Sequence, residues 1–192
     1  MRLLIALILF TLPFAASPEE MRDLARVAIQ AALDQRDGLY NLGVSFYAGR
    51  SVKQDYSKAA YLWKKASDKG SLAAKNNLGY LYFEGLGVAP DADAAVKLWR
   101  EAAEKGHGES QLHLGNAIFH GAGSAKDEAL GIAWVMCSIQ NAKKNPFEPE
   151  LGGGPEILAL AEQELVSMSS SVAESVLMSA KQITAGLQAC AE

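Results

Sequence analysis

The chain has few of the residues that define several common protein classes. Its 192 residues include two cysteines, too few for a disulfide-dense mini-fold or a four-thiolate zinc site. Lysine and arginine number 18 against 22 aspartates and glutamates, so the basic excess typical of nucleic-acid binders is missing. No apolar run reaches the roughly 18 residues that a membrane-spanning helix needs. With 49% apolar and 21% charged residues, the composition predicts a folded domain or a short repeat array.

Motifs of catalysis and cofactor binding are also missing. No serine has a lysine three residues later, and Gly-x-Ser-x-Gly, His-Glu-x-x-His, glycine-rich phosphate loops and EF-hand loops do not occur. His107, His113 and His120 are the three histidines. Positions 113 and 120 would lie about 10 Å apart along a helix axis, too far to share a metal ion. We therefore expect no catalysis, cofactor or metal site, and interpret the histidines as solvated surface residues.

Residues 1–17 have the pattern of a secretory signal peptide. Arg2 precedes an apolar stretch, and small residues follow near Ala15 and Ala16. A buried N-terminal helix or an uncleaved signal anchor are the alternatives. The pattern predicts an exported protein, periplasmic in a Gram-negative cell, with no membrane insertion after signal cleavage.

The middle of the chain repeats with a period of 36 residues. The recurring groups are Leu42-Gly43, Leu78-Gly79 and Leu114-Gly115, then Trp63 and Trp99, and finally Asp55, Asp91 and Asp127. Each unit predicts two helices, because a glycine such as Gly49 can end the first and the aspartate can cap the second. One helix pair cannot bury its own apolar stripe, whereas stacked pairs can. The pattern therefore predicts an all-α solenoid of antiparallel helix pairs.

Unit two carries a family resemblance. The pattern Leu78-Gly79-x-x-Tyr82-x-x-Gly85-x-Gly87-Val88-x-x-Asp91, followed by Ala95 and Ala102-Ala103-x-x-Gly106, resembles the Sel1-like repeat, a relative of the tetratricopeptide repeat. The units span 36–71, 72–107 and 108–142; the third is degenerate, and in the first Ser51 replaces the usual second turn glycine. The resemblance implies a non-catalytic protein-protein interaction module, an adaptor or regulator in the cell envelope. Alternatives are a small hydrolase of cell-wall or β-lactam substrates and a structural part of an envelope assembly.

Both flanks of the repeats predict caps. A capping box from Ser17 to Glu20 opens a helix over residues 18–35, which would cover unit one. Residues 143–155 are rich in proline and glycine and predict a loop. Residues 156–192 predict a capping helical hairpin, whose last helix starts at a second capping box from Ser171 to Glu174.

The two cysteines fall in unit three and at the C-terminus. Cys137 occupies the repeat position of Lys65 and Glu101, which face outward in the other units. If the C-terminal hairpin covers that surface, an oxidising compartment favours a disulfide between Cys137 and Cys190. Two buried free thiols are the alternative.

The polar, varied face of the first helix in each unit is the candidate binding surface. In related solenoids these helices line the concave groove, so we predict a protein or peptide partner there, with asparagine amides facing a peptide backbone and Tyr80 adding contact area. A merely solvated helix face is the alternative. The predicted contact residues are Asn41, Val44, Asn77, Tyr80, Glu84, His113, Asn116 and His120.

Overall fold

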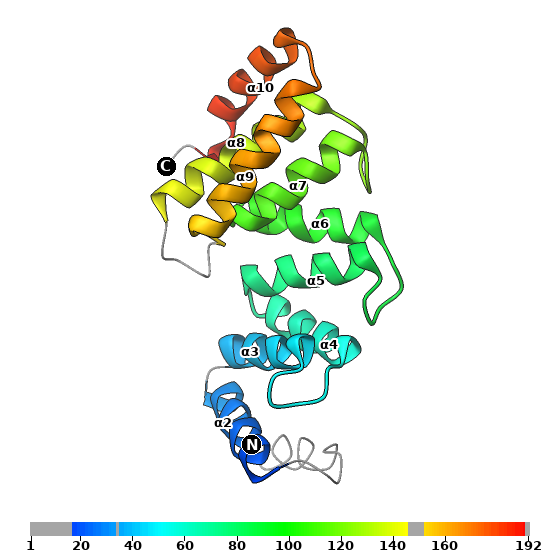
Figure 1. Ribbon diagram of the computed structural model, residues 1–192, viewed down its shortest axis with the longest axis vertical. Helices are drawn as coiled ribbons and strands as arrows, with labels where there is room; N and C mark the ends of the chain where they lie inside the picture. Colours follow the sequence, from blue (N-terminus) through cyan, green and yellow to red (C-terminus); the bar gives the residue numbers. More distant parts are fainter. Residues whose placement is uncertain (1–16, 34, 146–151, 191–192) are drawn as a thin grey trace.

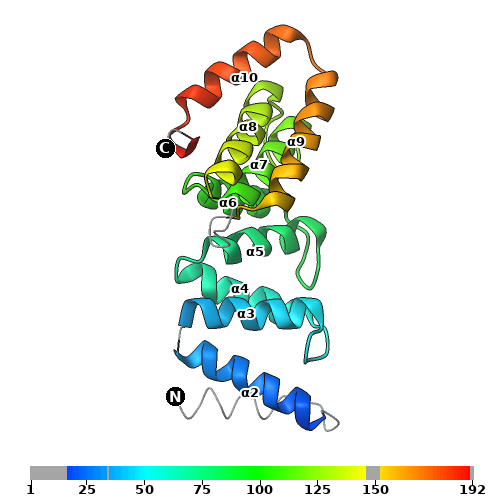
Figure 2. The same cartoon turned by 60° about the vertical axis from the view of Figure 1, so that its left-hand side comes forward.

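The computed structural model describes residues 17–33, 35–145 and 152–190, and these residues contain helices and no strand. Consecutive helices from α2 to α8 pack against one another and build an elongated stack (Figures 1 and 2). The predicted all-α solenoid is therefore confirmed. The helices are α2 (Pro18–Leu33), α3 (Gln35–Ala48), α4 (Tyr56–Asp68), α5 (Leu72–Glu84), α6 (Ala92–Ala103), α7 (Gly108–His120), α8 (Glu128–Lys144), α9 (Pro155–Ser170) and α10 (Glu174–Gly186), followed by the 3₁₀ turn η2 (Gln188–Cys190).

The second helix of each pair begins at the recurring aspartate. The side chains of Asp55, Asp91 and Asp127 accept hydrogen bonds from backbone N–H groups three residues later, at 3.0, 2.8 and 2.9 Å. Such a cap satisfies one of the N–H groups that a helix start leaves without a partner. The same local chemistry thus starts α4, α6 and α8, as the repeat predicts.

Two tryptophans fill the interior of units one and two. The indole N–H of Trp63 donates to the Tyr40 carbonyl at 3.2 Å, and that of Trp99 donates to the Asn76 carbonyl at 3.1 Å. Trp63 is 2% exposed and Trp99 3% exposed. Because each indole spans from the second helix of a unit to the backbone of the first, it fixes the distance within the pair.

The turn inside each pair also joins that pair to the preceding one. Gly87 has a φ of 70°, and a Cβ there would lie 2.4 Å from backbone atoms of Tyr56 and Ser57 at the start of α4. The Ser57 hydroxyl donates to the Gly87 carbonyl at 2.8 Å. A glycine is required here both by the left-handed backbone and by the close approach to the neighbouring unit.

The N-terminal cap has the predicted chemistry. The Glu20 carboxylate accepts from the Ser17 N–H at 2.5 Å, and the Glu20 N–H donates to the Ser17 hydroxyl at 3.2 Å. This capping box opens α2, which packs on α3 through a small cluster containing Leu24, Leu42 and Leu62. The predicted signal peptide lies outside the described residues, apart from Ser17. Within the described ranges, no helix is both long and apolar enough to cross a bilayer.

The C-terminal cap differs from the predicted hairpin. α9 and α10 pack chiefly on α8 rather than on each other. Figures 1 and 2 show both helices beside α8. The predicted capping box is wrong, because the Ser171 hydroxyl donates to the Met168 carbonyl at the end of α9. α10 begins after Ala173, with no side-chain cap. α8 also continues to Lys144, beyond the predicted end of unit three at residue 142.

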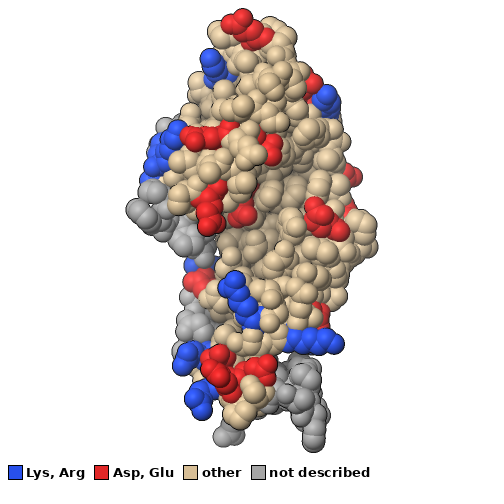
Figure 3. All heavy atoms as spheres, in the orientation of Figure 1, with Lys and Arg blue, Asp and Glu red and all other residues tan. Residues whose placement is uncertain are grey.

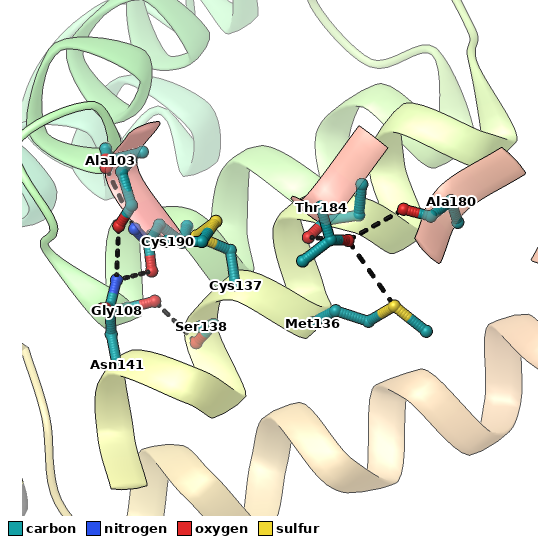
Figure 4. Close-up of a disulfide and its surroundings, with 12 residues drawn as sticks. Ala103, Gly108, Met136, Cys137, Ser138, Asn141, Ala180, Thr184 and Cys190 are labelled. Carbon is teal, nitrogen blue, oxygen red and sulfur yellow. Dashed lines mark hydrogen bonds between the residues drawn. A yellow bond between two sulfur atoms is a disulfide. The ribbon is translucent and has the colours of Figure 1, made fainter. Parts of the chain in front are cut away.

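A disulfide ties the end of the chain to unit three. Cys137 on α8 is bonded to Cys190 in η2, with the Cα atoms 5.2 Å apart. The Asn141 side chain donates to the Ala189 carbonyl at 3.1 Å and to the Gln111 side chain at 2.8 Å. Figure 4 shows this bond beside the buried polar groups of α8. The disulfide therefore anchors η2 over the last helix pair.

Candidate functional site

The first helices of the three pairs border a hollow on the solenoid. Its volume is about 440 Å³, and α3, α5 and α7 all contribute to its wall. On the face drawn in Figure 3, broad uncharged areas separate small groups of charged side chains. We call this hollow the groove pocket. It is lined by Tyr40, Val44, Tyr47, Ala48, Arg50, Trp63, Asn76, Asn77, Tyr80, Glu109 and His113.

Three rings form a row along the groove pocket. The Tyr47 and Tyr80 ring centroids lie 6.5 Å apart, and those of Tyr80 and His113 also lie 6.5 Å apart. Each ring comes from a different first helix, α3, α5 or α7. Offset and edge-to-face aromatic contacts at such distances hold rings in defined orientations. The row gives the pocket a continuous aromatic surface across all three units.

Tyr47 is the centre of the aromatic contacts. Its ring centroid lies 5.4 Å from that of Tyr56 and 5.4 Å from that of Trp63. Burial raises the pKa of Tyr47, and the neighbouring Tyr80 and the negative charge of Glu84 add to the rise. The hydroxyl therefore stays protonated at neutral pH and is able to donate a hydrogen bond.

A carboxylate and an imidazole face each other on α7. The Glu109 Oε1 atom lies 3.9 Å from the His113 Nε2 atom, and the His113 ring stacks on Trp99 with centroids 5.0 Å apart. Burial alone would raise the pKa of Glu109, but hydrogen bonds and charge from His113 and a hydrogen bond from Asn76 outweigh burial and lower it. Glu109 is therefore a fixed negative charge in the pocket wall at neutral pH.

A buried polar network lies beneath the pocket. The Ser110 hydroxyl donates to the Asn76 side-chain carbonyl at 3.0 Å, joining α7 to α5. The Asn76 amide in turn donates to the Asn77 side-chain carbonyl at 3.3 Å. Since Asn76 and Ser110 are almost fully buried, these bonds set the position of the helices that carry the aromatic row. This network orients the Asn77 side chain at the pocket surface.

The predicted contact residues fall into two groups. The structure brings together Val44, Asn77, Tyr80 and His113, which all line the groove pocket. The other four predicted residues do not line it; Asn41, Glu84 and His120 are exposed and Asn116 is half-buried. The role of all eight in binding a partner stays a prediction.

Tyr40, Tyr47 and Asn76 line the pocket but are not among the predicted contact residues. At the 36-residue spacing of the repeat, Tyr47 falls in the position of Phe83 and Phe119. The aromatic row instead has a spacing of 33 residues, since Tyr47, Tyr80 and His113 step back about one helical turn from one unit to the next. The 33-residue spacing is therefore the signal in the sequence that indicates this row.

The histidines are not all on the surface. His107 is 1% exposed and caps α7, because its Nδ1 atom accepts from the Ser110 N–H at 3.1 Å. Burial lowers the pKa of His107 to about 4, so the ring is neutral. The prediction of a solvated residue is wrong here, because Gly152 packs directly on the ring. Among the described residues, no three histidines, cysteines or carboxylates are grouped to hold a metal ion.

Comparison with known proteins identifies the repeat. The model of the Sel1 repeat matches residues 36–71, 72–107 and 108–135, together more than half of the chain. No curated protein matched the sequence. Solved structures with a similar fold include the following two.

One is a protective antigen of uropathogenic Escherichia coli strains that displays an SLR fold, with a TM-score of 0.57 and 27% sequence identity. The similarity covers 86% of this chain and 40% of the antigen, so the chain spans less than half of that protein. The other is a Sel1 repeat protein from Oxalobacter formigenes, with a TM-score of 0.57 and 24% identity, covering 76% of this chain and 98% of that one. The second similarity shows the fold alone.

Proposed function

Since the chain belongs to the Sel1 repeat family, we propose that it is an exported, non-catalytic adaptor or regulator that binds a partner polypeptide in the cell envelope. The Sel1 repeat fold suggests a protein-interaction module. The observation that carries the proposal is the aromatic row of Tyr47, Tyr80 and His113, which crosses three units along one groove pocket. Export rests on the signal-peptide pattern of residues 1–17.

The pocket wall suits a polypeptide because it combines rings with amide groups. Tyrosine supplies large contact area at a low cost in side-chain entropy. The Asn77 side-chain carbonyl accepts from Asn76, which leaves the Asn77 amino group to donate to a peptide carbonyl. An extended backbone laid along the row would meet this amide donor and the aromatic rings.

A hydrolase has less support in the same region. The Ser110 hydroxyl lies 2.9 Å from the His107 Nδ1 atom, the pairing expected of a nucleophile and its base. Both side chains are almost fully buried, however, and the serine donates to Asn76. A substrate would not reach that hydroxyl without unfolding the start of α7. These contacts support a structural role for the pair.

Partner capture by groove variants tests the proposal. The chain is cross-linked in its own envelope and purified, as wild type and as the combined variant Tyr47→Ala, Asn77→Ala and Tyr80→Ala. We expect the variant to lose the co-purifying partner while its far-ultraviolet circular dichroism keeps the helical signal. Tyr61→Ala is the matched control, because Tyr61 is 63% exposed and lies outside the pocket wall. Capture that survives in the triple variant would refute the groove as the binding surface.

A further inference from the structure

We propose that the groove pocket seats a basic side chain, a lysine or an arginine, of the partner polypeptide. The inference rests on the proposed function and adds to it the chemistry of the residue that anchors the partner. It is carried by two features of the described residues: aromatic rings that line a hollow, and the Glu109 carboxylate in the wall of that hollow, which forms no ion pair with a lysine or arginine.

The aromatic rings supply the first attraction. Tyr47 and Tyr80 line the hollow from two helices, and Tyr40 lies beside them. The face of an aromatic ring carries a partial negative potential, which attracts a lysine ammonium or an arginine guanidinium within about 6 Å. Contacts of Tyr47 with Tyr56 and Trp63 hold its ring in place before any partner arrives. The rings also provide an apolar surface for the methylene stem of a long basic side chain.

The carboxylates supply the second attraction. Glu109 lines the hollow, and Glu84 lies close enough to act on the Tyr47 hydroxyl. In the described part of the chain neither forms an ion pair with a lysine or arginine, since the contact of Glu109 is with His113. A partner cation would therefore find one carboxylate in the pocket wall, that of Glu109, and a second, that of Glu84, outside the wall.

The basic residues of the first helices are engaged elsewhere. Arg36 pairs with Asp37 at 2.6 Å, and Lys75 pairs with Glu101 of α6 at 2.5 Å. α7 contains no lysine or arginine. Neither Arg36 nor Lys75 therefore pairs with Glu109 in the pocket wall.

One basic residue, Arg50, also lines the hollow. It is exposed and follows the C-terminal end of α3, whereas Glu109 lies in the first turn of α7. Its charge would oppose a basic anchor and favour an acidic one. Removal of Arg50 should therefore raise the affinity for a basic anchor, and removal of the Glu109 charge should lower it. The two directions together test whether the anchor is positively charged.

The test uses peptides of defined sequence and the purified chain. Random twelve-residue peptides are selected on the immobilised wild-type protein, and the retained peptides are synthesised. Their anchor is found by alanine scanning and replaced by an uncharged isostere, norleucine for lysine or citrulline for arginine. We expect the retained peptides to share a lysine or arginine, and the isostere to weaken binding about tenfold.

Protein variants locate the anchor. Glu109→Gln and Tyr80→Ala should each weaken binding several-fold, because the first removes a charge and the second a ring. Arg50→Ala should strengthen binding at low salt, because it removes a repulsive charge. In high salt, which screens that charge, it should leave binding unchanged. Glu104→Gln is the control for charge removal, since Glu104 is an exposed carboxylate at the end of α6, outside the pocket wall.

The outcomes separate this inference from the proposed function. Peptides that depend on Tyr47 and Tyr80 but are anchored by an apolar or acidic side chain would overturn the basic anchor and leave the groove as a polypeptide-binding surface. Peptides that bind equally well to Tyr80→Ala, or a selection that retains none, would overturn both. A basic anchor weakened by Glu109→Gln and not by Glu104→Gln supports the inference.

Discussion

Gly79 of α5 lies directly against the indole of Trp99 on α6. A Cβ at Gly79 would come within 2.6 Å of the Trp99 Nε1 atom, and a Cβ at Gly43 would come within 2.5 Å of Trp63. The repeated leucine–glycine step therefore makes room for the repeated tryptophan. In the first two helix pairs, the leucine–glycine step and the tryptophan are therefore the two sides of one contact.

Gly79→Ala tests this contact. An alanine in a helix interior normally gains about 1 kcal/mol over glycine. Here the methyl group meets a buried indole, so we expect overpacking to dominate and the free energy of unfolding to fall by about 1–3 kcal/mol. Urea unfolding followed by circular dichroism measures the change. Gly186→Ala is the matched control, because nothing lies within 4 Å of a Cβ there. Equal effects of the two substitutions would contradict the account.

The disulfide provides a second prediction. The bond between Cys137 and Cys190 closes a segment with a sequence separation of 53 residues. Constraining an unfolded chain of that length stabilises the folded state by about 4 kcal/mol in the chain-entropy model. We expect a reductant to remove this stabilisation and therefore to lower the urea concentration at which half of the wild-type protein is unfolded. The double variant Cys137→Ala, Cys190→Ala should unfold at the lower midpoint with or without reductant. An unchanged midpoint of the reduced wild type would contradict the prediction.

Acid should destabilise the protein through His107. Burial lowers the pKa of His107 to about 4 in the folded chain, against 6.5 for the ordinary residue, and Glu109 and His113 are the charged neighbours that act on it. The unfolded state therefore binds the proton first, so the stability present above pH 6.5 is lost as the pH falls toward 4. Between pH 7.5 and pH 5 the loss should be about 2 kcal/mol.

The matched variant is His107→Asn, which keeps a capping residue without a titrating group. Stability curves of both proteins between pH 7.5 and pH 5 are compared, a window above the range in which the carboxylates with lowered pKa values, such as Glu101 and Glu109, become protonated. We expect the variant to show the flatter curve. Parallel curves would mean that His107 does not control the acid response.

The helix pairs could be predicted because their causes are local and periodic. Asp55 and Asp91 cap helices through bonds to residues three positions away, so the cap is visible in any single unit. Ser51 is the position at which unit one departs from the usual turn glycine of the repeat. Its φ is 61°, a conformation that favours glycine. The Ser51 hydroxyl donates to Asp23 of α2 at 3.4 Å.

The C-terminal cap and part of the groove could not be predicted from local signals. Ser171 and Glu174 match a capping box, yet the helix start depends on how α10 packs on α8, through contacts such as that of Thr184 with the Ala133 carbonyl. Tyr47 is not among the predicted contact residues, yet it lines the groove pocket beside Tyr80. Such neighbours are set by the stacking of units, which no single unit encodes.

Site-specific photo-cross-linking tests whether a polypeptide binds in the groove pocket. A photoreactive phenylalanine analogue is placed at position 80 in the aromatic row, and at position 61, where Tyr61 is exposed on α4. We expect a covalent adduct with one partner polypeptide from position 80 and none from position 61. Adducts of equal yield from both positions, or an adduct from position 61 alone, would contradict a polypeptide bound in the groove.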